Sequence, residues 1–150
     1  MTETRLPVVD HEGLYEVSDL GNVWSLERWT APGRGHRHLP EKLLEQSPVT
    51  GGYLAVQLNK DGRGKTRTVH QLVLEAFVGP CPDGMECRHF PDGDRTNNRL
   101  TNISWGTKSQ NMGDKRVQGT HFMGERHPNA SVTDACVASI LSDLASGYTT

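Results

Sequence analysis

The chain has 150 residues, of which 34% are hydrophobic, 6% aromatic and 23% charged, with 16 glycines and eight prolines. This length suits one compact domain or two small ones, and the glycine and proline content indicates a loop-rich protein. No apolar run approaches the roughly 20 residues of a membrane helix, and the first residues lack the apolar stretch of a secretory signal. Neither a membrane protein nor a secreted disulfide scaffold is therefore expected.

The net charge of −2 is unevenly distributed along the chain. Residues 1–20 carry five acidic residues against one basic residue, whereas residues 21–116 carry 14 basic and ten acidic residues. A basic centre between acidic ends permits a polyanionic partner without requiring one.

The three cysteines form no CxxC pair, which indicates reduced thiols in an intracellular protein. Cys81, Cys87 and His89 could supply three zinc ligands, but their spacing fits no standard zinc knuckle. A structural Zn²⁺ is therefore not expected, and a zinc-stapled interaction domain is the weakest of the alternatives.

The sequence of the N-terminal part predicts short strands. Apolar and polar residues alternate on both sides of a turn, which predicts a hairpin over 13–26. Residues 29–39 have no period and are expected to form an exposed basic loop. Residues 53–58 are predicted to form a strand, which a glycine-containing turn connects to a basic strand over 65–69.

The central part combines helices with a second hairpin. Apolar residues recur at helical spacing over 69–77, and Gly79-Pro80 ends that helix. A strand is expected over 85–89 and another over 103–105, with a polar loop between them. A polar helix follows over 107–116, with Thr107 as its N-cap.

The C-terminal part predicts one more helix. Residues 131–145 are amphipathic, with their apolar residues on one side. Because such a face needs a partner, the chain is expected to stop inside a further module.

Three polar residues stand out in the central part. His89 ends one strand, Asn102 begins the next, and Asn111 lies one turn into the helix, so a hairpin packed on a helix can bring them to one point. A histidine beside an oxygen ligand, flanked by basic residues, suits metal-assisted phosphodiester hydrolysis. The imidazole takes a proton from water, and a divalent ion offsets the charge on the phosphate and the leaving oxygen.

The motifs 69–77, 87–105 and 109–112, in this order, resemble the HNH endonucleases of phages and mobile introns. Upstream, 13–26 is similar to the nuclease-associated modular domain that often precedes this nuclease. Downstream, 124–130 and the amphipathic helix resemble the entry to a helix-turn-helix region.

The resemblance implies an α+β fold: a ββα-metal (HNH, His-Me finger) core preceded by a small antiparallel β-rich module, with a C-terminal amphipathic helix. It divides the chain into the β-rich module at 1–66, the catalytic core at 67–118, and a linker with a partial helix-turn-helix-like extension at 119–150.

The family's roles transfer to matching positions as expectations. His89 corresponds to the general base, Asn102 to the asparagine that holds the base in place, and Asn111 to a metal ligand on the helix. The implied activity is a metal-dependent DNA endonuclease that leaves 5′-phosphate and 3′-hydroxyl ends, such as a nicking homing endonuclease. The implied ion is Mg²⁺ or Mn²⁺.

Arg88 departs from the family pattern, in which the residue before the base often binds the metal. Arginine cannot coordinate a cation. Asp92, Asp94 or a backbone carbonyl could replace the ligand, or Asn111, water and DNA phosphate could hold the ion weakly. A further interpretation is that the chain is an inactive copy of the nuclease. The alternative function is a non-catalytic DNA-binding module on the same fold.

The expected partner is double-stranded DNA, in the cytoplasm of a bacterium or as a phage product, and both a monomer and a homodimer stay open. The basic residues near the motif are expected to bind phosphates of the DNA backbone, although they could also form a solvated face. The DNA-contacting candidates are Lys65, Arg67, His70, Arg88, Arg95, Arg99, Lys108, Lys115 and Arg116.

Overall fold

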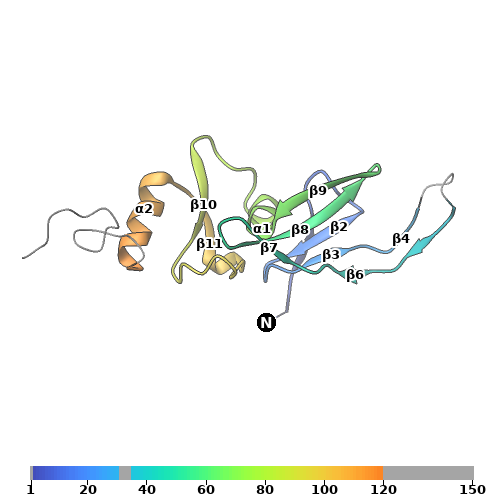
Figure 1. Cartoon of the computed structure of the whole chain (residues 1–150), viewed down its shortest axis with the longest axis horizontal. Coiled ribbons are helices and arrows are strands. Elements are labelled where there is room, and N and C mark those ends of the chain that lie inside the picture. The colour runs from blue at the N-terminus through green and yellow to red at the C-terminus, as the bar shows by residue number, and fades with distance from the viewer. Residues whose placement is uncertain (1, 31–34, 120–150) are drawn as a thin grey trace, which may run out of the picture. The chain divides into compact units, whose positions relative to one another are not determined.

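The computed structural model describes residues 2–30 and 35–119 (Figure 1). The chain divides into two compact units, Met1–Asp114 and Lys115–Thr150. The amphipathic helix predicted for 131–145 lies outside the described residues, and the three-part domain division stays a prediction. In the described part of the chain, no helix is both long enough and apolar enough to cross a membrane.

Short strands dominate the described residues, as expected for an α+β fold. The strands are β1 (Arg5–Pro7), β2 (Tyr15–Ser18), β3 (Val23–Ser25), β4 (Arg28–Trp29), β5 (His38–Leu39), β6 (Lys42–Leu43), β7 (Ser47–Val49), β8 (Tyr53–Lys60), β9 (Arg63–Thr68), β10 (Met85–His89) and β11 (Ile103–Thr107). The helices are α1 (Val69–Phe77), the 3₁₀ turn η1 (Leu100–Asn102) and α2 (Lys108–Val117).

The predicted N-terminal hairpin is present as β2 and β3, inside an antiparallel sheet of order β1-β2-β3-β6. Its turn is closed by the Ser18 hydroxyl, which accepts hydrogen bonds from the backbone N–H groups of Leu20 (3.3 Å) and Asn22 (3.1 Å). Gly21 completes the turn with a φ of 84°, a conformation that favours glycine.

Two further ladders follow in the chain. The long hairpin β8–β9, with β7 on its other edge, matches the two predicted strands. The segment 29–39, expected to be a loop without structure, is bounded by the two-residue strands β4 and β5, which pair with each other. The expectation was wrong at these ends because such short ladders carry no recognisable period.

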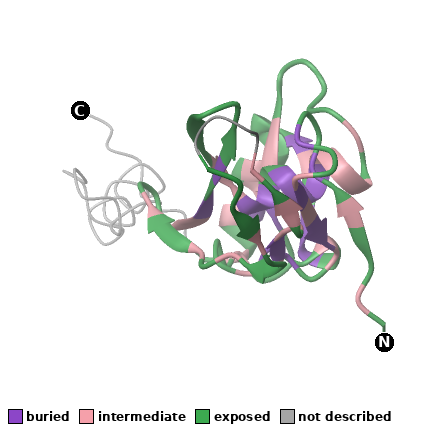
Figure 2. Ribbon diagram, turned by 90° about the vertical axis from the view of Figure 1, so that its right-hand side faces the viewer, coloured by how far each residue is buried: buried purple, intermediate pink, exposed green. Residues whose placement is uncertain are grey.

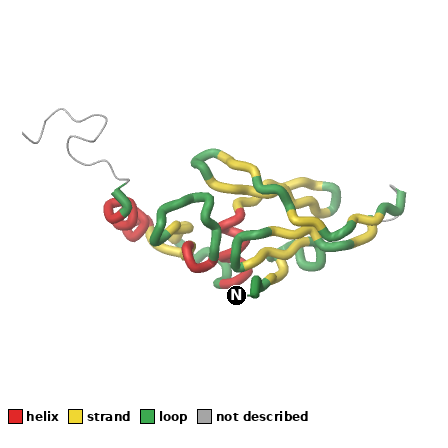
Figure 3. Tube along the Cα trace, turned by 90° about the horizontal axis from the view of Figure 1, so that it is seen from below, coloured by secondary structure: helices red, strands yellow, loops and turns green. Residues whose placement is uncertain are grey.

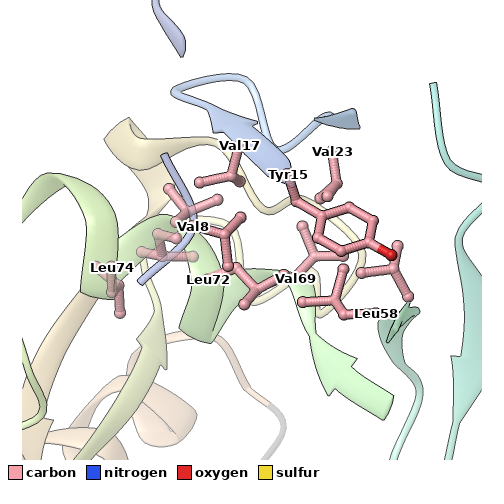
Figure 4. Close-up of a cluster of buried hydrophobic side chains, with 11 residues drawn as sticks. Val8, Tyr15, Val17, Val23, Leu58, Val69, Leu72 and Leu74 are labelled. Carbon is pink, nitrogen blue, oxygen red and sulfur yellow. The ribbon is translucent and has the colours of Figure 1, made fainter. Parts of the chain in front are cut away.

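Helix α1 forms the centre of the hydrophobic core. Val69, Leu72, Val73 and Leu74 are almost fully buried, as its apolar stripe predicts. They lie among buried side chains from β2, β3 and β8 (Figure 4). The buried residues, purple in Figure 2, gather in the interior of the ribbon. The Tyr15 hydroxyl joins the two sheets, because it donates to the Asn59 carbonyl (3.2 Å) and accepts from the Asn59 N–H (2.9 Å).

The β10–β11 hairpin and the start of α2 complete the first unit (Figure 3). Thr107 caps α2 as predicted: its hydroxyl accepts from the N–H of Gln110 (3.2 Å). The Gln110 side chain in turn accepts from the N–H of Thr107 (2.9 Å). This reciprocal capping box fixes where α2 begins, and therefore which of its side chains face the hairpin.

Candidate active site

His89 lies at the end of β10, opposite Ile103 in β11, and is 8% exposed. Its ring centroid lies 5.3 Å from that of His70 in α1 and 5.7 Å from that of Tyr53 in β8. The three rings come from α1, β8 and β10, so the packing of these elements fixes the place of the imidazole.

Burial lowers the pKa of His89, because desolvation penalises the charged ring. The hydrogen bond to Asn98 and the charges of Asp92 and Asp94 act in the opposite direction, and Arg95 adds to the lowering. The net effect keeps the ring neutral at physiological pH, which is the form that accepts a proton.

Asn98 contacts the imidazole directly, since its Oδ1 lies 3.3 Å from His89 Nε2. Asn98 itself is 4% exposed and lies close to Gly21 in the turn between β2 and β3. A Cβ placed on Gly21 would lie 3.0 Å from both the Cβ and the carbonyl oxygen of Asn98, so only glycine lets the two turns approach this closely.

Asn102 holds the loop that follows His89. Its amide nitrogen donates to Asp92 Oδ1 (2.7 Å) and to the Asn97 carbonyl (3.1 Å), while its Oδ1 accepts from the Asp92 N–H at 3.4 Å. Its own carbonyl accepts from the N–H of Phe90 at 2.9 Å. Asn102 therefore ties both ends of the loop together beside His89.

The other face of β10 carries Glu86 and Arg88, which meet α2. The Asn111 amide donates to Glu86 Oε1. One turn further along α2, Asp114 accepts two hydrogen bonds from Arg88, of 2.6 Å from Nε and 2.7 Å from Nη2. The guanidinium is thus held by a carboxylate of the protein.

A cavity of about 400 Å³ opens between these groups. It reaches both the Glu86–Asn111 contact and the side of the hairpin where His70 and Cys87 lie. The lining residues are Tyr53, Thr68, His70, Gln71, Cys81, Met85, Glu86, Cys87, Trp105 and Asn111. The cavity is large enough for several water molecules or a phosphate group.

The acidic loop residues are already engaged. Asp92 accepts hydrogen bonds from Asn97, Asn102 and the N–H of Asp94, and Asp94 accepts from the N–H and hydroxyl of Thr96. Burial alone would raise the pKa of Asp92, but its hydrogen bonds together lower it. Asn111 and Glu86 also fit a hard divalent ion, since both line the cavity and both side chains carry oxygen atoms.

Two family models match the described part of the chain. Residues 67–113 match the HNH endonuclease family, and residues 3–59 match the NUMOD4 motif. Residues 67–113 of the chain therefore belong to the HNH endonuclease family. The HNH match spans α1, both strands of the second hairpin and the first half of α2, and thus includes His89, Asn102 and Asn111.

Proteins similar in sequence to this HNH chain include one from a bacteriophage and one from a giant virus. DNA endonuclease I-HmuI of Bacillus phage SP01 is 34% identical over 110 residues, which are 73% of this chain and 56% of that protein. An uncharacterised HNH endonuclease of Acanthamoeba polyphaga mimivirus is 32% identical over 65% of this chain and 22% of its own length. The chain thus spans about half of I-HmuI and about a fifth of the viral protein.

A solved structure of the HNH homing endonuclease I-HmuI, described as binding and cleaving DNA, has a TM-score of 0.63 to this chain. The identity is 28%, and the match covers 97% of this chain and 68% of that one. The predicted fold class and family are therefore confirmed.

The basic residues of this HNH chain that were predicted to contact DNA lie in different surroundings. Lys65, Arg95, Arg99, Lys108 and Arg116 are exposed, and Lys115 is half-buried. Three others have partners inside the protein: Arg67 makes two 2.7 Å hydrogen bonds to Glu75, Arg88 pairs with Asp114, and His70 is 6% exposed. Their roles in DNA binding stay predictions.

Three residues at the site were not singled out from the sequence, namely Glu86, Asn98 and Asp114. Asp114 lies one helical turn after Asn111, and Glu86 lies two residues before Arg88 on the strand, so helical and strand periodicity place each on the same face as a predicted site residue. That signal could have found both, whereas the contact of Asn98 with His89 depends on the path of the loop.

Proposed function

We propose that this chain is a DNA endonuclease that hydrolyses a phosphodiester bond with His89 as its general base. The observation that supports this most directly is the neutral, buried imidazole of His89, oriented by Asn98 and enclosed by the loop that Asn102 ties. Family membership supplies the reaction class, and I-HmuI is the relative whose DNA cleavage supports the substrate.

The hydrogen bond to Asn98 determines which ring nitrogen acts. In the orientation that the structure gives this amide, Nε2–H of His89 donates to Asn98 Oδ1. The lone pair of the neutral ring is then on Nδ1, which takes the proton from the attacking water. Asn98 and Asn102 are positioning residues, because they act through His89.

Asn111, with Glu86 beside it, would hold a divalent ion such as Mg²⁺ or Mn²⁺. When bound, the ion supplies positive charge to the phosphate and to the leaving 3′ oxygen. Arg88 stays paired with Asp114 and contributes no ligand. Asp92 and Asp94 keep the loop closed and are not needed as ligands.

The substrate we propose is double-stranded DNA, cut to 5′-phosphate and 3′-hydroxyl ends in the manner of a nicking homing endonuclease. The exposed Lys65, Arg99 and Lys108 are suited to phosphate contacts because their charges face solvent. An intracellular setting in a phage-infected bacterium fits the relative from Bacillus phage SP01.

The test is conversion of supercoiled plasmid to nicked or linear DNA in Mg²⁺ or Mn²⁺, with and without a chelator. His89→Ala should lower the cleavage rate by about 10²–10⁴-fold, the usual contribution of a general base. His38→Ala, on the exposed β4–β5 hairpin, is the matched control and should cut like the wild type. Undiminished cutting by His89→Ala would reject the assignment.

A second candidate is a non-catalytic DNA-binding module, which the Arg88–Asp114 ion pair favours because it fills the position of a metal ligand. This candidate predicts a gel-mobility shift of duplex DNA without any cleavage in Mg²⁺, Mn²⁺ or Ca²⁺. Cleavage that depends on metal and on His89 excludes it.

A further inference from the structure

His70, Cys87 and His89 converge beside the cavity. Their ligand atoms, one ring nitrogen from each histidine and the Cys87 sulfur, all lie within 4.8 Å of one another. His70 is the second residue of α1, and the other two lie on the same face of β10. The general-base role of His89 uses neither His70 nor Cys87.

His70 has an unsatisfied atom in this cluster. The residue is 6% exposed, its Nε2 lies 3.3 Å from the Thr68 hydroxyl, and its buried Nδ1 has no hydrogen-bond partner. Burial lowers the pKa of His70 to about 4, so the ring is neutral and able to bind a cation. An unpaired buried ring nitrogen is costly unless a ligand completes it.

We propose that His70, Cys87 and His89 form a binding site for a zinc-like transition-metal ion. Two imidazole nitrogens and a thiolate are the donors that Zn²⁺ prefers, whereas Mg²⁺ requires oxygen donors. The site is therefore chemically distinct from the oxygen pair of Asn111 and Glu86. It also differs from the three candidate zinc ligands considered from the sequence, because His70 takes the place of Cys81.

The geometry requires only a small contraction. In a tetrahedral zinc site the ligand atoms lie roughly 3.5 Å apart, so the three side chains close by about 1 Å. Burial raises the pKa of the Cys87 thiol to about 12, and a bound cation would release that proton. Cys81 lines the same cavity, but its exposed thiol donates to the Met85 carbonyl at 3.3 Å.

An ion at this site switches the nuclease off. This part rests on the proposed function: a ring nitrogen of His89 that is bound to metal cannot take a proton from water. Zinc bound here and Mg²⁺ at Asn111 would thus have opposite effects on cleavage.

The binding test uses Co²⁺, whose thiolate complexes absorb in the near ultraviolet, added to the chelator-treated full chain. One equivalent should produce a sulfur-to-cobalt band that Zn²⁺ removes. Cys87→Ser should abolish the band and His70→Gln should weaken cobalt binding at least tenfold, with folding checked by circular dichroism. Cys81→Ser and Cys136→Ser are the matched controls and should retain it. Absence of the band in the wild type, or its survival in Cys87→Ser, overturns the site.

The activity test adds Zn²⁺ to plasmid cleavage in Mg²⁺. One equivalent should inhibit the wild type, whereas Cys87→Ser should need at least tenfold more Zn²⁺ for the same inhibition. Cobalt binding without zinc inhibition would overturn the switch and leave the site standing. A wild type that binds cobalt but never cuts DNA would reject the proposed function, because the spectrum assesses the site independently of activity.

Discussion

Arg88 and Asp114 form a bidentate ion pair between β10 and α2, with N–O distances of 2.6 and 2.7 Å. The side chains are only 17% and 10% exposed. A nearly buried pair of this geometry fixes the helix on the hairpin, and it places a positive charge where the family pattern often has a metal ligand.

Replacing one residue of this pair should leave the charge of the other without a partner, so the effects of the two single substitutions should not add in the double variant. Arg88→Ala or Asp114→Ala alone leaves an uncompensated charge and should cost about 3 kcal/mol, whereas the double variant should cost less than the sum of the two. Urea unfolding of the four proteins of the cycle measures this. Single variants within about 0.5 kcal/mol of the wild type would show that the pair contributes little to stability.

Arg88→Asp should convert this contact into a cation site. The new carboxylate would face Asp114 and repel it, and a divalent ion would relieve the repulsion together with Asn111. We expect Mg²⁺ to raise the thermal midpoint of this variant by about 4 °C or more over its value in chelator, and that of the wild type by less. Equal shifts in both proteins would contradict this expectation.

Gly106 gives room to the Arg88 side chain. A Cβ at Gly106 would lie 2.0 Å from Arg88 Cδ, and Asp114 prevents the side chain from moving away. Gly106→Ala should therefore destabilise the wild type and have a smaller effect in an Arg88→Ala background. Gly113→Ala in α2, where no neighbour lies within 4 Å, is the matched control and should stabilise by up to about 1 kcal/mol. Thermal denaturation compares all four variants.

The strongly patterned elements could be predicted from the sequence. The stripe of α1 and the alternation of β2 and β3 each repeat often enough to identify a buried face. Strands β1, β6 and β7 were missed because two or three residues show no period. The pairing of β6 also depends on a distant partner, as Leu43 opposite Trp24 illustrates.

The same limit applies to the site. His89, Asn102 and Asn111 stand in a motif, so their positions could be found by order along the chain. Helical periodicity also places Asp114 on the face of Asn111. Its pairing with Arg88, 26 residues away, could not be predicted, because the contact depends on how α2 lies on the hairpin. The nearness of His70 to His89 likewise results from the packing of α1.

Asn102→Ala should reduce both stability and cleavage, although Asn102 touches no substrate in the proposed mechanism. The variant loses the three hydrogen bonds of the amide side chain, which should cost about 1–3 kcal/mol and loosen the loop beside His89. Asn59→Ala, with an exposed side chain, is the matched control. Urea unfolding and plasmid cleavage give the two measurements. If the Asn102→Ala variant is destabilised but cleaves at the wild-type rate, the loop does not contribute to catalysis.

His70 should make stability depend on pH between about 4 and 6.5. Burial, and then the nearby His89, lowers the pKa of His70 from 6.5 to about 4, so in this window the unfolded chain carries a proton that the folded one lacks. The free energy of unfolding therefore rises with pH by up to about 1.4 kcal/mol per pH unit in this window. The contribution of His70 to stability is complete above pH 6.5 and is lost as the pH falls from 6.5 towards 4. The pKa of His89 is lowered as well, which adds a slope of the same sign. Urea unfolding in chelator should show a weaker dependence for His70→Gln and the wild-type dependence for His38→Gln. An unchanged slope in His70→Gln would mean that His70 takes up its proton in the folded protein as readily as in the unfolded chain.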